Sequence, residues 1–89
     1  MNRLNQLKRF ITLVYKNGHV LVEIKSRGRT LKVLSNVHDR LTLFEQDALV
    51  IHVYKLFERS TSNKDLKQSI TNTNYAQVFG SPWHLNGNV

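Results

Sequence analysis

The chain has 89 residues, no cysteine and a formal net charge of +7. The length predicts one small domain, and the lack of cysteine excludes a disulfide framework and a thiolate metal site. The longest apolar runs are too short for the core of a signal peptide or for a membrane span. We therefore expect an intracellular protein that has no membrane partner.

The positive charge lies in the first half of the chain. Residues 1–43 carry nine Lys and Arg against two acidic residues, whereas residues 44–89 carry four of each kind. A basic excess attracts polyanions. Because the excess is gathered in one half, we expect that half to bind nucleic acid; the alternative is the solvated surface of an ordinary basic domain.

The basic half has the composition of β-strands. Residues 10–16 are rich in β-branched and aromatic side chains. Asn17-Gly18 supplies the two positive-φ positions of a type I′ turn, so residues 19–25 are expected to return as the second strand of a hairpin.

A second turn at residues 26–29, with Gly28 able to take positive φ, leads to a third strand at residues 30–34. Residues 40–43 are either a short fourth strand or the lead-in to a helix. The first half thus predicts an antiparallel meander.

Residues 44–59 have the pattern of a helix, with acidic side chains in the first turn and basic ones near the end. The apolar residues cover an arc of about 160°, wider than the stripe of about 100° that one sheet face requires. The surplus indicates a helix buried on two sides, as at a subunit interface. We expect a homodimer through Leu49, Val53, Leu56 and Phe57. The alternative is that residues 50–53 form a strand.

From residue 60 onward the composition is polar, which alone is typical of a tail. A short helical turn is possible at residues 64–70, and Gly80 and Pro82 interrupt any helix joining Tyr75 to Trp83. The expected fold is therefore α+β: a curved antiparallel sheet of about four strands, then a helix. Residues 1–60 are expected to form the nucleic-acid-binding domain and residues 61–89 a polar C-terminal extension.

Basic side chains on strands and hairpin tips suit phosphate, which Arg meets as a planar fork and Lys as a point charge. Aromatic side chains such as Phe10 and Tyr15 suit stacking on unpaired bases. The predicted nucleic-acid contacts are Lys8, Arg9, Tyr15, Lys16, Lys25, Arg27, Arg29, Lys32 and Arg40.

Nothing in the sequence completes a catalytic or metal site. His38-Asp39 lacks a nucleophile placed by pattern, and the four histidines are scattered without metal-ligand spacing. We expect no enzyme, no metal and no cofactor.

Two segments resemble the positive cofactor four family of single-stranded-DNA-binding transcriptional coactivators. Residues 14–24 resemble the family's hairpin, and residues 41–49 resemble the start of its helix; the resemblance covers residues 8–59. It implies a homodimer packed through the helix, with sheets that bind unpaired strands. The family's loop tryptophan has no counterpart at residues 26–29.

The leading expectation is a homodimeric binder of single-stranded nucleic acid, DNA rather than RNA, that acts in transcription, replication or recombination. One alternative is a sequence-specific binder of duplex DNA that lays a β-ribbon in a groove. Another is a structural or partner-binding viral protein whose basic half is only a solvated surface.

Overall fold

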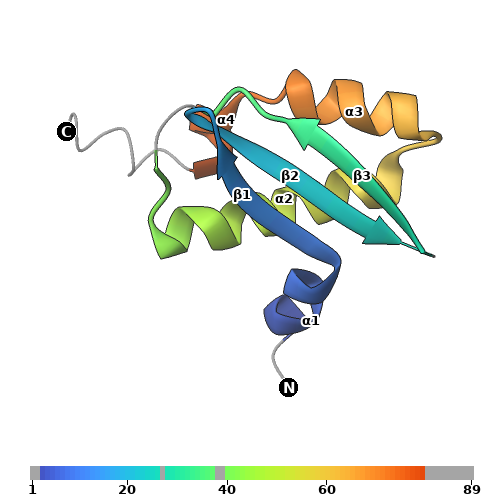
Figure 1. The fold of residues 1–89 in the computed structure, drawn as a ribbon, viewed down its shortest axis with the longest axis horizontal. Coiled ribbons are helices and arrows are strands. Elements are labelled where there is room, and N and C mark those ends of the chain that lie inside the picture. The colour runs from blue at the N-terminus through green and yellow to red at the C-terminus, as the bar shows by residue number, and fades with distance from the viewer. Residues whose placement is uncertain (1–2, 27, 38–39, 80–89) are drawn as a thin grey trace.

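The computed structural model describes residues 3–26, 28–37 and 40–79 (Figure 1). In chain order, its elements are α1 (Arg3–Phe10), β1 (Ile11–Lys16), β2 (His19–Ser26), β3 (Arg29–Leu34), α2 (Leu43–Arg59), α3 (Asn63–Thr71) and α4 (Tyr75–Phe79). The α+β class expected from the sequence is confirmed. None of the described helices is long and apolar enough to cross a membrane.

The three strands form one antiparallel sheet in the order β1-β2-β3. Its first hairpin turns at the predicted dipeptide: Asn17 has a φ of 53° and Gly18 a φ of 81°, and Lys16 lies opposite His19. Positive φ at both positions suits the right-handed twist of the paired strands. Gly28, with a φ of 78°, takes the same region at the second turn.

The expected fourth strand is absent from this sheet, because the chain enters α2 instead. The Thr42 hydroxyl accepts a hydrogen bond from the Glu45 amide at 3.1 Å, and the Glu45 carboxylate accepts one from the Thr42 amide at 2.8 Å. This reciprocal pair is a capping box, which satisfies amide groups that the first helical turn leaves free. Residues 41–43 therefore begin a helix rather than extend the sheet.

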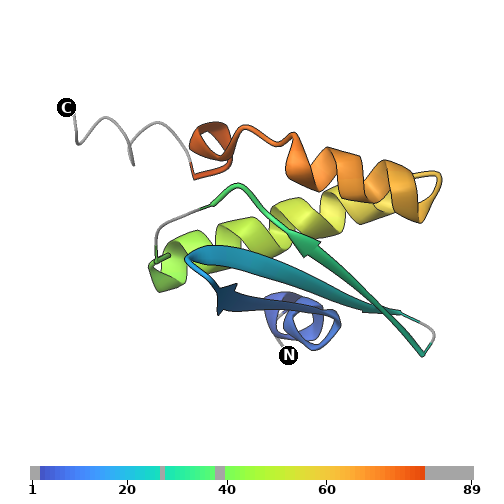
Figure 2. The ribbon, with the colours of Figure 1, turned by 45° about the horizontal axis from the view of Figure 1, so that its top comes forward.

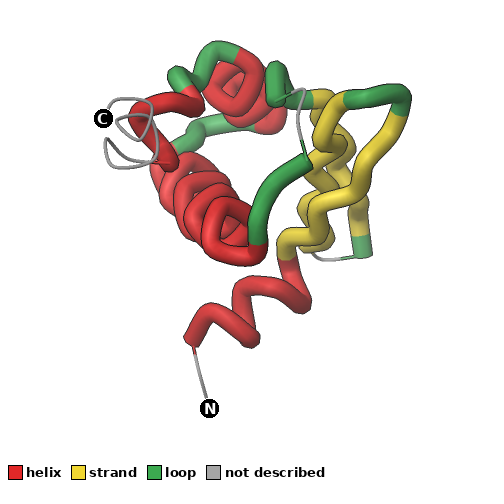
Figure 3. Tube along the Cα trace, turned by 90° about the vertical axis from the view of Figure 1, so that its left-hand side faces the viewer, coloured by secondary structure: helices red, strands yellow, loops and turns green. Residues whose placement is uncertain are grey.

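Within the described residues, the helices cover one face of the sheet and leave the other uncovered. Figure 3 shows α2 and α3 on one side of the strands, and Figure 2 shows the same layers from another angle. Side chains along β2 alternate between the two faces of the sheet. Val20, Val22 and Ile24 are 2% exposed or less and point toward the helices. The residues between them point to the open side.

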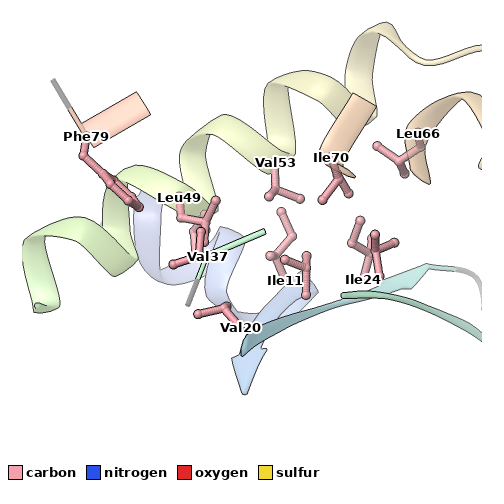
Figure 4. Packing of buried hydrophobic residues seen from close by; sticks show 12 residues of the cluster. Ile11, Val20, Ile24, Val37, Leu49, Val53, Leu66, Ile70 and Phe79 are labelled. Carbon is pink, nitrogen blue, oxygen red and sulfur yellow. The ribbon is translucent and has the colours of Figure 1, made fainter. Parts of the chain in front are cut away.

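The core lies between this inner sheet face and the helices (Figure 4). Val53 of α2, Ile70 of α3 and Ile11 of β1 meet there, each 1% exposed or less. Leu66 and Phe79 belong to the same cluster. The predicted domain boundary after residue 60 therefore does not divide the core, because α3 and α4 close it from the side that α2 leaves open.

α1 was not expected from the sequence. It ends in Phe10, whose ring packs edge-on against Phe57 at 4.9 Å and Tyr54 at 6.3 Å between ring centroids. Edge-to-face contacts of this kind stabilise aromatic pairs by about 0.5–1.5 kcal/mol beyond the area they bury. α1 thus covers a second side of α2.

The expected dimer contacts need correction for this reason. Leu49 and Val53 are 0% exposed within a single chain, so their side chains cannot contact a second copy. Leu56 and Phe57 are half-buried and pack against the same core. The wide apolar arc of α2 is real, but α1, α3 and α4 of the same chain contact this helix on its further sides.

Replacing Val53 with Asp is expected to unfold the chain rather than to separate subunits. A carboxylate at this position has no partner in the apolar core, and an uncompensated buried charge costs about 3–5 kcal/mol, most of the stability of a small domain. Thermal melting followed by circular dichroism measures the effect. The matched control is Ile51→Asp on the outer surface of α2, where Ile51 is 39% exposed; that variant is expected to keep its fold. A folded Val53→Asp chain would contradict this placement of α2.

Candidate nucleic-acid interface

Three of the predicted lysines lie together on the uncovered sheet face. Lys16 stands near the end of β1, Lys25 on β2 and Lys32 on β3, and all three are exposed. The strand register places them on this face, since Lys16 lies opposite His19 and Lys32 opposite Glu23, whose neighbours in β2 point to the core. We call this surface the open face.

Cations outnumber acids on the open face. Among the described residues of the three strands, Glu23 is its single carboxylate. It lies between Thr12 of β1 and Lys32 of β3. Lys16 and Lys25 lie two residues or more away along the strands, so the acid does not offset all of the charge.

An apolar row crosses the open face between Lys16 and Lys32. Val14 lies opposite Leu21, and Leu21 lies opposite Leu34. Val14 is 41% exposed and Leu34 48% exposed. We call these three residues the apolar row. Sequence reasoning missed it, although the hairpin register set by Asn17-Gly18 places Val14 beside Leu21 once the turn type is known.

Tyr15 and Arg40 do not join the open face. Tyr15 lies opposite buried Val20, so its side chain is on the helix-covered side of the sheet. There the Arg40 guanidinium carbon stands 5.6 Å from the centre of the Tyr15 ring, within the range of a cation–π interaction. The structure brings these two predicted residues to each other and away from the lysines.

The remaining predicted cations are dispersed. The Lys8 ammonium pairs with the Asp47 carboxylate at 2.8 Å, which links α1 to α2. Arg9 is exposed on α1. Arg29 is exposed at the start of β3 and lines a groove of about 1000 Å³ on the helix-covered side, together with Phe57 and Asn63. Arg27 lies outside the described residues, as do His38, Asp39 and Trp83.

No Phe, Tyr or Trp side chain lies on the open face in the described part of the strands. Phe10 packs into the α1–α2 contact, and Tyr15 is on the other side of the sheet. The open face therefore offers cations, aliphatic carbon and the half-buried ring of His19 to a ligand, but no Phe, Tyr or Trp ring on which a base can stack.

The histidine of α2 has a structural contact. His52 is half-buried, and its Nε2 lies 3.2 Å from the Thr73 hydroxyl. Burial, followed by the nearby charges of Arg59 and Lys55, lowers the pKa of His52 below its usual value. The ring is therefore neutral near pH 7. Within the described residues, no group of three His, Asp or Glu side chains is placed to hold a metal ion.

A second hollow lies beside this histidine, between the outer surface of α2 and α4. It measures about 550 Å³ and is bordered by Phe44, Ile51, His52 and Val78. Phe44 is 71% exposed and the preceding Leu43 is 76% exposed. These are large apolar side chains to leave in water, and they lie away from the open face, on another side of the molecule.

No family model, curated protein or solved structure matches this chain. The resemblance to the positive cofactor four family thus stays a prediction from the sequence. The case for any function consequently depends on the chemistry of the surfaces described above.

Proposed function

We propose that this protein binds duplex DNA through the open face of its sheet. The observation that carries the proposal is that Lys16, Lys25 and Lys32 share the one sheet face that no described helix covers. Exposed lysines bind phosphate oxygens and release the counterions condensed on DNA, and this release provides most of the affinity in non-specific binding.

The dimensions of the sheet suit a DNA groove. Adjacent strands are about 4.8 Å apart, so three strands span about 10 Å, comparable with the major groove of B-DNA, which is about 12 Å wide. Lys16 and Lys32 stand on opposite outer strands and four residues apart along them, which separates their Cα atoms by about 17 Å. Lysine side chains at that separation reach the phosphates on the two sides of a groove.

In the sequence analysis, the resemblance to the positive cofactor four family favoured single-stranded DNA, and Phe10 and Tyr15 were the candidate side chains for stacking on its bases. Binding of unpaired strands commonly depends on aromatic platforms. With Phe10 in the core and Tyr15 beside Arg40, that contribution is missing from the open face. Phosphate contacts from two outer strands suit a duplex better. A-form RNA is a poorer fit, because its deep major groove does not admit side chains.

We also propose that the homodimer expected from the sequence forms through the outer surface of α2. Leu43, Phe44 and Ile51 are its exposed apolar residues. In a two-fold interface the same patch meets itself. Ala48 lies one helical turn from Phe44 and allows two α2 helices to approach closely, so that Phe44 of each copy enters the hollow bordered by Ile51 and Val78 of the other.

The open face is tested by a triple change, Lys16→Gln with Lys25→Gln and Lys32→Gln. Duplex DNA affinity is expected to fall, and the slope of log K against log salt to become shallower by about 2 to 3, because each lost phosphate contact removes about 0.9 from that slope. Fluorescence anisotropy at several salt concentrations measures both quantities.

The matched control removes three exposed helical lysines, by Lys55→Gln, Lys64→Gln and Lys67→Gln, with the same change of net charge. It is expected to keep most of the affinity. Equal losses in both triple variants would mean that net charge alone attracts DNA. Tighter binding of a single strand or of duplex RNA of the same sequence at matched salt would overturn the choice of ligand.

The dimer is tested by Phe44→Asp and Ile51→Asp. Light scattering is expected to give the mass of two chains for the unaltered protein and of one chain for either variant, because a carboxylate at the contact is desolvated without a partner. Leu34→Asp on the open face is the control and is expected to leave the mass unchanged. An unaltered protein that is monomeric at tens of micromolar would refute this interface.

A further inference from the structure

Within the described residues, the apolar row on the open face does not pack against the hydrophobic core. Val14, Leu21 and Leu34 face away from the helices, and Val14 and Leu34 leave 41% and 48% of their surface in water. An outer sheet face usually carries polar side chains, because the alternation of a half-buried strand places apolar residues inward. Three aliphatic residues opposite one another therefore suggest a ligand.

The row lies between the cations. Along the strands, the Lys16–His19 pair is on one side of it and the row of Thr12, Glu23 and Lys32 on the other. If the lysines hold the two sugar–phosphate backbones, which is the function proposed above, then the residues between them lie over the base pairs. The apolar row then meets base edges and not phosphates.

The base edges offer one apolar group to such a row. In the major groove, guanine, cytosine and adenine present only hydrogen-bonding groups, whereas thymine adds a C5-methyl group beside its oxygen. Aliphatic side chains cannot satisfy the polar edges, so covering a G·C pair leaves donors and acceptors without partners. When an aliphatic side chain covers a thymine methyl, the apolar surfaces of both the methyl group and the side chain are removed from water.

We propose that Val14, Leu21 and Leu34 read thymine C5-methyl groups, so that the protein prefers thymine-containing sites in the major groove. This inference rests on the proposed duplex binding and adds the base that the open face selects. The side chains of the row are about 4.8 Å apart across the strands, so the row is about 10 Å long. It runs in the direction that spans the groove in the arrangement proposed above, and it therefore covers the edges of about one or two base pairs.

The test compares duplexes that differ only in the methyl group. One contains thymine, the second has deoxyuridine at every thymine, and a third, of G·C sequence, is compared with and without 5-methylcytosine, which carries a methyl at the same ring position. The expected result is a loss of about fourfold in affinity per contacted methyl on replacing thymine by deoxyuridine, and a gain with 5-methylcytosine.

Two variants connect this preference to the row. Val14→Thr keeps the shape of the side chain and replaces a methyl by a hydroxyl, and Leu34→Asn removes the apolar surface on β3. Both positions are solvent-exposed, so the fold is expected to persist, as circular dichroism will check. Each is expected to reduce the preference for thymine over deoxyuridine without abolishing it, because the other residues of the row remain. Gln68→Ala, at an exposed position of α3 outside both proposed interfaces, is the control and is expected to keep the preference.

The outcomes separate this inference from the function on which it rests. Equal affinity of the unaltered protein for the thymine and deoxyuridine duplexes, with salt-dependent duplex binding intact, overturns methyl recognition and leaves duplex binding standing. A preference for thymine that is undiminished in both Val14→Thr and Leu34→Asn also overturns the assignment to the row. An absence of duplex binding at low salt overturns both proposals.

Discussion

The burial of one face of a three-stranded sheet under α2 and α3 is the constraint from which the rest of the surface follows. Once Val20, Val22 and Ile24 are held in the core, strand geometry fixes the direction of every residue between them. Strand pairing then fixes which side chains of β1 and β3 point to each face, since residues directly opposite one another share a face. The gathering of Lys16, Lys25 and Lys32 is thus a consequence of core packing.

Local chemistry allowed several elements to be predicted from the sequence. The Asn17-Gly18 turn, the strands beside it and the helix after Thr42 each have a short-range cause: positive φ at the turn and a capping box at the helix. Of the two interpretations of residues 40–43, the structure has the lead-in to a helix and not the fourth strand. The side chains of Thr42 and Glu45 accept hydrogen bonds from each other's backbone amides and so begin the helix at Leu43. The α1 helix escaped notice because Phe10, which ends it, was assigned by composition to the first strand. Its other apolar residues, Leu4 and Leu7, pack on a core formed by residues distant in sequence.

The candidate site was predicted only in part, because charge along the chain does not specify a face. Lys8 and Arg40 are as basic as Lys16, yet one pairs with Asp47 and the other lies over Tyr15. Those contacts join residues far apart in sequence. The same is true of α2, whose apolar arc was recognised but whose partners, α1, α3 and α4, lie on both sides of it in the chain. Tertiary packing, which the pattern of one segment cannot show, decided between core and subunit contact.

The two-residue turn at Asn17-Gly18 makes the ligand surface sensitive to chain length. It fixes Lys16 opposite His19, and the side-chain period of a strand is two. If one residue were inserted into this turn and the register of β1 against β2 shifted by one, Lys16 and Val14 would point toward the helices. Leu13 and Tyr15 would then lie on the open face. Two residues inserted would preserve the faces and only displace the lysine relative to the apolar row. Natural or designed variants of this fold are therefore expected to tolerate length changes here in even steps, and to keep the same chemistry on the same side only when they do.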